Sequence, residues 1–248
     1  MTQSSRYREV LLALDDWQDY LTAESGLPGP RANLELVETV ADIGDRRRFD
    51  QLLACGPDVA PANTPGEFLA VCGVVGLGKL LVEGDMGVLE RLRQHANDPR
   101  WRVREGVAMA LQRSGREDAA RLIDWISPWQ NGSLLERRAL AAALCEPDLL
   151  TDKTCTRRTL EILDKITTSI LSEVDRRSDE FKTLRKGLGY CWSVAVAALP
   201  DAGIPAMERW FDCDDRDILW VMRENLRKAR LMRADPAWVE RSRARLGM

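Results

Sequence analysis

One short residue pattern occurs three times in the chain and constrains its fold more than any other feature. Residues 98–107 and 217–226 share the spacing D-x-x-W-x-x-R-E-x-[VL], and a shorter form, D-x-x-W-x-x-R, begins at Asp235. Chance is a poor explanation for three copies in 248 residues. Internal self-similarity of this kind is typical of proteins built from stacked structural repeats.

The spacing of apolar residues between the turns is helical. Val103, Val107 and Leu111 fall on one face of a helix that follows Trp101. No sustained alternation of apolar and polar residues predicts a β-strand. We therefore expect an all-α fold.

Capping residues mark where the helices begin. Residues 64–67 and 133–136 are capping boxes, and Asp98 is an N-cap aspartate followed by proline. With these signals, the first helices of successive pairs are expected to begin near residues 31, 66, 99, 133, 178 and 214. The intervals of about 35, 33, 34, 45 and 36 residues have the regularity of a helical repeat array.

The pattern resembles the HEAT repeat, in which an aspartate near the start of a helix is followed by Val-Arg about a turn and a half later. Asp98 with Val103 and Arg104 fits this repeat best. The resemblance implies that aspartates and arginines of neighbouring repeats pair along the stack, while apolar stripes pack between the helices. A single helix pair cannot bury its apolar face alone, so such pairs stack into a solenoid.

We therefore predict a right-handed superhelical α-solenoid of about six HEAT-like, or armadillo-like, helix pairs. It is expected to form a single repeat domain over residues 1–248, with residues 1–25 as a candidate N-terminal capping helix. The longest irregular connections are expected at residues 56–66 and 145–154.

A second resemblance covers residues from about 68 to 211. Residues 181–193, with their Phe, basic residues and Gly-aromatic step, together with residues 101–104, resemble the bacterial HEAT-like DNA-alkylation-repair glycosylases. The resemblance implies a concave, arginine-lined groove for duplex DNA and a tryptophan, an aspartate and an arginine around the lesion. This chain has residues 68–72, Phe-Leu-Ala-Val-Cys, where that family carries Trp-x-x-x-Asp, and the expected later arginine is replaced in residues 192–194. A cysteine cannot stabilise a developing cation as a carboxylate does, so the glycosylase site is expected to be missing.

Residues 181–193 also contain Gly187 and Gly189 within a helical pattern. Each glycine costs a helix interior roughly 1 kcal/mol relative to alanine, so we expect something to approach this backbone closely. Packing of a neighbouring helix is the preferred interpretation. A ligand or phosphate near these glycines and Lys186 is the alternative.

The helix around Trp220 is the most basic element of the chain. Arg223, Arg227 and Arg230 follow one another at i, i+4 and i+7. Such a run is usually a solvated face that pairs with acidic neighbours. The alternative is a ridge that follows phosphates, with Trp220 available for stacking.

Eight tryptophans, against three tyrosines and four phenylalanines, give an unusual aromatic composition. Indole rings fill gaps between helices and also anchor interfaces. Most are expected in the core, whereas Trp125 and Trp129, on either side of Pro128, are the better candidates for exposed anchors. The candidate binding residues are Trp101, Arg102, Trp125, Trp129, Arg185, Lys186, Trp192, Trp220, Arg227 and Arg230.

Composition narrows the classes of function. No apolar run approaches the roughly 18 residues of a membrane span, and the polar N-terminus is unlike a secretory signal, so we expect a cytoplasmic protein without a membrane partner. Six scattered cysteines without C-x-x-C spacing and one histidine, His95, predict neither a disulfide framework nor a metal site. No cofactor-binding motif occurs, so no cofactor is expected.

Two functional hypotheses follow. The first is a non-catalytic helical-repeat module that binds a macromolecule, either protein or nucleic acid, along a concave face rich in arginine and tryptophan. The second is a DNA glycosylase or lesion-binding protein similar to the alkylation-repair family, with Trp101, Trp192 and nearby arginines in the groove. The net charge of −3 argues against indiscriminate nucleic-acid binding, and the missing catalytic set favours the first hypothesis.

Overall fold

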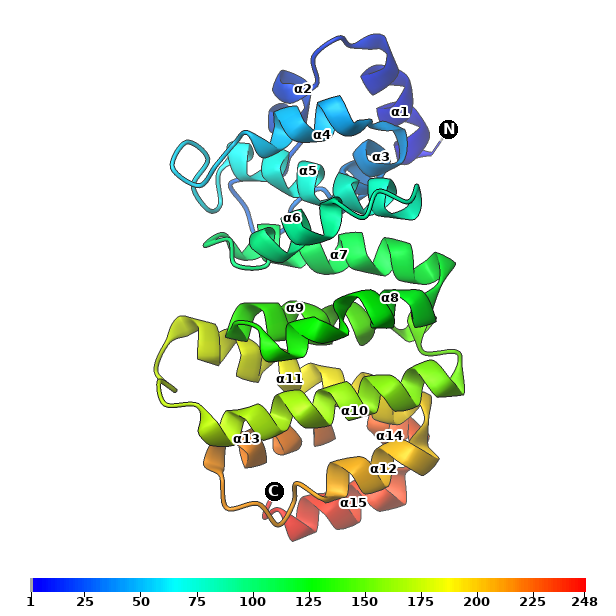
Figure 1. The fold of residues 1–248 in the computed structure, drawn as a ribbon, viewed down its shortest axis with the longest axis vertical. Coiled ribbons are helices and arrows are strands. Elements are labelled where there is room, and N and C mark those ends of the chain that lie inside the picture. Colours follow the sequence, from blue (N-terminus) through cyan, green and yellow to red (C-terminus); the bar gives the residue numbers. More distant parts are fainter. Residues whose placement is uncertain (1) are drawn as a thin grey trace. The chain divides into compact units, whose positions relative to one another are not determined.

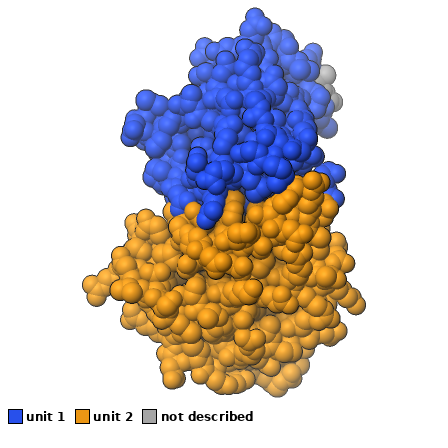
Figure 2. Space-filling view, viewed as in Figure 1, with its two compact units in different colours: residues 1–117 blue, residues 118–248 orange. Residues whose placement is uncertain are grey.

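The structure, a computed structural model, describes residues 2–248. It contains fifteen α-helices and three short 3-10 helices, and these described residues include no β-strand (Figure 1). The all-α prediction is therefore confirmed. The chain divides into two compact units, residues 1–117 and 118–248, which Figure 2 colours separately.

Unit 1 is built around one long apolar helix. This helix, α5, packs against α3, α4 and α7, and all of its residues from 67 to 81 except Lys79 are buried. The helices of the unit are α1 (Gln3–Ala13), α2 (Gln18–Ala23), α3 (Leu34–Ile43), α4 (Arg46–Leu53), α5 (Pro65–Val82), α6 (Val88–His95) and α7 (Trp101–Glu117).

Helix α5 is also the one helix of residues 2–248 that is long and apolar enough to cross a membrane by length and composition. The sequence-based expectation that no apolar run approaches this length is therefore wrong for α5. Most of the helix is buried within unit 1, which explains its apolar composition as that of a core helix.

Two glycines let the neighbours of α5 approach its backbone. A Cβ atom at Gly76 would lie 2.2 Å from the ring of Phe49 in α4. A Cβ atom at Gly78 would lie 2.5 Å from the carbonyl oxygen of Ala110 in α7. The absence of side chains at these two positions therefore sets how closely α4 and α7 pack on α5.

The candidate capping helix over residues 1–25 is two short helices, α1 and α2. The chain leaves the helical conformation at Leu14, and the Trp17 indole Nε1 donates to the carbonyl of Leu11 at 2.8 Å. Asp16 then accepts a hydrogen bond from the backbone N–H of Gln18 at 3.0 Å. Helix α1 packs against α3 and α2 packs against α5.

Unit 2 is organised around α11. Helices α9 and α13 both pack against α11, and α10 and α12 also contact it and each other. The elements of the unit are α8 (Ala119–Ile126), η1 (Ser127–Asn131), α9 (Leu134–Leu144), η2 (Pro147–Leu149), α10 (Lys153–Ser169), η3 (Ile170–Ser172), α11 (Asp179–Ala198), α12 (Pro200–Glu208), α13 (Arg216–Leu226), α14 (Ala229–Ala234) and α15 (Pro236–Arg245).

The six predicted helix starts correspond to α3, α5, α7, α9, α11 and α13, which begin at residues 34, 65, 101, 134, 179 and 216. Each lies within three residues of its expected position. The N-cap hydrogen bond of both predicted capping boxes forms: Thr64 accepts from the Glu67 N–H at 3.4 Å, and Ser133 from the Glu136 N–H at 3.1 Å. At Thr64 the reciprocal bond does not form, because the Glu67 side chain accepts from the backbone N–H of Asn63 instead. The long interval between α9 and α11 holds α10, which has 17 residues where α4, α6 and α8 have 8 each.

Candidate functional site

The three aspartates of the repeated pattern make different contacts. Asp217 accepts from Arg185 of α11. Asp98 instead pairs with Arg100, whose Nε and NH2 donate to its two carboxylate oxygens at 2.9 and 2.8 Å. Asp235 caps α15 through the backbone N–H of Trp238. Among the three, only Asp217 thus pairs with an arginine of another helix.

The three tryptophans of the pattern also differ in exposure. Trp101 is 49% exposed and lies under the guanidinium of Arg102, 4.4 Å from the ring centroid. Trp220 is partly buried under Arg185 at 4.5 Å. Trp238 is only 3% exposed. The pattern therefore places a tryptophan within the first two turns of α7, α13 and α15, and the neighbouring elements decide whether its ring reaches the surface.

Two candidate tryptophans lie in the core of unit 2. Trp129 is buried because η1, which carries it, packs against α9 and α10. Trp192 is fully buried, and its indole Nε1 donates to the Thr167 hydroxyl at 3.0 Å. Neither ring is available to a ligand, which corrects the expectation of an exposed anchor at Trp129 and of a groove residue at Trp192. Trp125 is partly buried, with the guanidinium of Arg121 at 4.6 Å from its ring.

The remaining candidates of unit 2 lie together on α11, α13 and α14. Trp220 of α13 packs against Gly189 of α11, where a Cβ atom would lie 3.2 Å from its ring. Arg230 of α14 lies over the ring of Tyr190, 4.5 Å from its centroid, and also donates to its hydroxyl. We call this surface the α11–α13 strip; it consists of Arg185, Lys186, Tyr190, Asp217, Trp220, Glu224, Arg227 and Arg230.

The two glycines of α11 are packing positions. Gly189 faces Trp220 and the Cβ atom of Glu224, and a Cβ atom at Gly187 would lie 3.3 Å from the Cγ atom of Arg138 in α9. Neighbouring helices therefore make the close approach that the sequence predicts at these positions. Lys186, which directly precedes Gly187, is exposed.

The strip is positively charged in a chain that is acidic overall. Four cations and two carboxylates give it a net charge of +2, against −3 for the whole chain. Two of its arginines are already paired within the strip: Arg185 donates to Asp217, and Arg227 to Glu224. Tyr190, which is exposed, was not among the sequence candidates, because its contact with Arg230 joins residues 40 positions apart.

Trp101 and Arg102 belong to a second cluster, in unit 1. Arg102 is buried, and its NH1 donates to the Glu67 carboxylate at 3.1 Å while its NH2 donates to the carbonyl of Gly29 at 2.7 Å. Glu67 is 0% exposed, and the backbone N–H of Asn63 also donates to its Oε2 at 2.7 Å. Its other oxygen, Oε1, has no hydrogen-bond partner among residues 2–248. Sequence reasoning missed this role because a capping box already accounted for the glutamate.

Arg100 holds the connection between α4 and α5 in the same unit. Its guanidinium is buried, and NH1 donates to the carbonyls of Cys55 and Ala60 at 2.8 and 3.1 Å. Together with the bond from Arg102 to Gly29, this contact ties two loops to the start of α7. These arginines therefore stabilise the fold, and Trp101 is the exposed part of the cluster.

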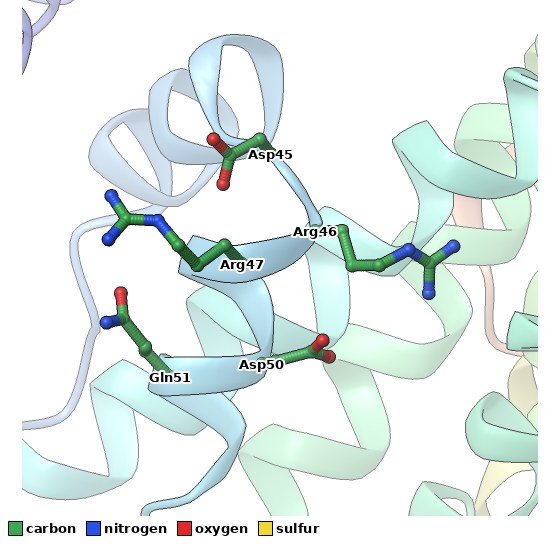
Figure 3. Close-up of a pocket in the computed structure, with 5 residues that line it drawn as sticks. All are labelled: Asp45, Arg46, Arg47, Asp50 and Gln51. Atoms are coloured by element: carbon green, nitrogen blue, oxygen red, sulfur yellow. The ribbon is translucent and has the colours of Figure 1, made fainter.

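The start of α4 forms an open depression whose side chains do not converge (Figure 3). Arg46 and Asp50 point to one side of the helix, whereas Arg47 and Gln51 point to the other. Asp50 pairs with Arg91 at 2.7 Å. The depression, which Asp45 completes, does not provide a set of groups aimed at one ligand.

The described residues offer no obvious reactive centre. No group of three or more His, Cys, Asp or Glu residues within 2–248 is placed to hold a metal ion. All six cysteines are free thiols. Burial raises the pKa of the Cys72 and Cys145 thiols, which keeps them protonated and makes them poor nucleophiles.

Asp215, beside the strip, should make unit 2 sensitive to acid. Burial alone would raise the pKa of Asp215, but hydrogen bonds from Arg176 and from the backbone N–H groups of Asp217 and Ile218 outweigh it and lower the pKa. A carboxyl whose pKa is lower in the folded state adds stability above its unfolded pKa of about 3.9, and this stability is lost as the pH falls through the folded value.

We therefore expect Asp215→Asn to lower the free energy of unfolding by roughly 1 kcal/mol at pH 7, and this difference to shrink as the pH falls below about 4. Urea unfolding of both proteins between pH 7 and pH 3 measures it. The matched control is Asp235→Asn, an N-cap aspartate without an ion pair among residues 2–248. A difference that stays constant over this pH range would contradict the assignment.

The candidate residues are thus divided between the Trp101 cluster of unit 1 and the α11–α13 strip of unit 2. The strip brings together Arg185, Lys186, Trp220, Arg227 and Arg230, whereas Trp129 and Trp192 are core residues.

In comparisons with known proteins, no family model, no curated protein and no solved structure matched the chain.

Proposed function

We propose that the chain is a non-catalytic helical-repeat binding module and that a macromolecule binds to its α11–α13 strip. The observation that carries this proposal is the pair of rings at the surface, Trp220 and Tyr190, each stacked under an arginine. Tryptophan, tyrosine and arginine are the residues that contribute most often to binding energy at protein interfaces.

The strip is also ordered before any partner arrives. Arg185 is held by Asp217 and by the Trp220 ring, and Arg230 is held by Tyr190. Side chains that are already fixed lose less conformational entropy on binding, which favours affinity. The same contacts give the surface a defined shape.

The contacts within each unit support a HEAT-like solenoid as the architecture. In unit 1, α3 and α7 pack on α5, and in unit 2, α9 and α13 pack on α11. First helices of successive pairs thus pack on one another, as they do when repeats stack. The match of the six helix starts to the predicted repeat intervals supports the same proposal.

A lesion-binding or glycosylase function is the second candidate, and one observation favours it. Glu67, one residue before the segment where the alkylation-repair glycosylases carry their Trp-x-x-x-Asp pair, is a buried carboxylate that pairs with Arg102, whose guanidinium lies over the exposed Trp101. Its charge, however, already balances that of Arg102. A carboxylate neutralised in this way is poorly suited to stabilise a cation that develops on a base, so we prefer the non-catalytic proposal.

Two experiments on the full-length protein separate these functions. A photo-crosslinking amino acid at Lys186 should give discrete adducts in living cells, whereas the same group at Lys165, an exposed position of α10, should not. Incubation with alkylated duplex DNA should release no base. Base release by the unmodified protein would replace this proposal with the glycosylase, and the lack of any adduct specific to Lys186 would reject the strip as a binding surface.

A further inference from the structure

We propose that the α11–α13 strip binds an acidic protein segment that carries an apolar residue among its aspartates and glutamates. This inference rests on the proposed function, because it names the partner of the same surface. It follows from how the cations of the strip are paired, from its aromatic rings and from an exposed apolar residue at one end.

The pairing of the cations disfavours nucleic acid. Affinity for nucleic acid comes largely from phosphates that neutralise lysines and arginines and release counterions. Arg185 and Arg227 already contact carboxylates of their own chain. Within residues 2–248, Lys186 and Arg230 are the cations of the strip without a carboxylate partner, so few phosphates could be neutralised.

The strip presents both signs of charge, which suits a peptide. Glu224, whose side chain is 21% exposed, lies beside Arg227 and Lys228. A peptide can donate its backbone N–H groups to this carboxylate, whereas a phosphate group has no donor to offer it. The peptide can at the same time place its own carboxylates near Lys186 and Arg230. The net charge of +2 selects an acidic segment over a basic one.

Apolar contacts lie within and beside the strip. The rings of Trp220 and Tyr190 provide flat apolar surface at positions fixed by their arginines. Val174, which is 95% exposed, stands two residues before Arg176, and Arg176 donates to Asp217 of the strip at 3.2 Å. An apolar side chain of the partner would remove these surfaces from water, which favours binding.

Selection from a library of displayed random 12-residue peptides tests the inference. The full-length protein is the bait, and a parallel selection uses the variant Lys186→Glu with Arg230→Glu, which reverses the net charge of the strip. The matched control is Arg157→Glu with Lys165→Glu, which changes two exposed cations of α10 in the same unit by the same amount. Thermal unfolding confirms that each variant folds. A pool of random single-stranded DNA of 20 nucleotides is offered to the same three proteins.

We expect peptides rich in Asp and Glu with at least one aromatic or aliphatic residue. Binding of the best peptide should fall at least about tenfold in the strip variant, because like charges then face each other, and should be unchanged in the control. Enrichment of basic or uncharged peptides, or equal binding to the strip variant, overturns the inference. If DNA binds more tightly than any peptide and this binding is lost in the strip variant, the surface binds nucleic acid. The proposal of a binding module then stands, and the acidic-peptide inference is wrong. If Lys186 crosslinks to a partner but the selection yields no acidic peptides, this inference is rejected and the proposed function is not.

Discussion

Replacing Glu67 by glutamine is expected to lower the free energy of unfolding by about 3–5 kcal/mol, the usual cost of removing one partner from a buried ion pair. The side chain of Arg102 is 8% exposed and that of Glu67 is 0% exposed, so the guanidinium would be left in the core without its counter-charge. An amide can accept a hydrogen bond from Arg102, but it cannot balance the positive charge.

Urea unfolding followed by tryptophan fluorescence measures this loss. In thermal unfolding, the expected decrease in melting temperature is roughly 6–20 °C, given about 2–4 °C per kcal/mol for a chain of this size. The matched control is Glu38→Gln in the same unit: its side chain is 42% exposed and pairs with Arg113 at 2.9 Å. An exposed pair contributes at most about 1 kcal/mol, so equal losses in the two variants would contradict a buried pair at Glu67.

Gly78→Ala is expected to destabilise the protein and Gly106→Ala is not, although both replace a glycine at the interface between α5 and α7. At Gly78 the added Cβ atom would lie 2.5 Å from the carbonyl oxygen and 2.7 Å from the Cα atom of Ala110. These are backbone atoms, so the two helices must separate. We expect Gly78→Ala to destabilise by about 1–3 kcal/mol, even though alanine is the better helix former.

At Gly106 the nearest atoms to an added Cβ are methyl carbons of Val74 and Val75, both at 3.4 Å. This is ordinary van der Waals contact. Alanine should therefore keep most of its helix-propensity advantage of about 1 kcal/mol, and Gly106→Ala should be neutral or stabilising. The midpoints of urea unfolding for the two variants provide the comparison. Stabilisation by Gly78→Ala would show that the two helices are not in such close contact at Gly78, and clear destabilisation by Gly106→Ala would show that there is no room for a methyl group at Gly106.

The sequence predicted the helical elements well because their signals are local. The N-cap residues Thr64 and Ser133 specify a helix start within four residues, and the structure contains both N-cap hydrogen bonds. The N-terminal region was predicted less well. The indole N–H of Trp17 donates a hydrogen bond to the carbonyl of Leu11, in the segment that separates α1 from α2. No capping or periodicity rule predicts this contact.

The candidate sites could be predicted only in part, because they depend on contacts between distant residues. The pairing of Glu67 with Arg102 spans 35 positions, and that of Tyr190 with Arg230 spans 40. The exposure of a side chain also depends on residues that are distant in the sequence. Trp192 stands in the middle of α11, on a helix whose neighbours enclose it, and its sequence surroundings do not distinguish it from a surface tryptophan.

The arginines at the start of α7 have a consequence for how unit 1 is assembled on the ribosome. Arg102 reaches back 73 positions to Gly29, and Arg100 reaches back 45 and 40 positions to Cys55 and Ala60. A nascent chain that has emerged only as far as α6 therefore still lacks the donors for these carbonyls. Contacts between distant positions form late because closing the intervening loop costs entropy before the contact can form. The loops that contain Gly29 and residues 55–60 should therefore become protected from proteases only once residue 102 has left the exit tunnel.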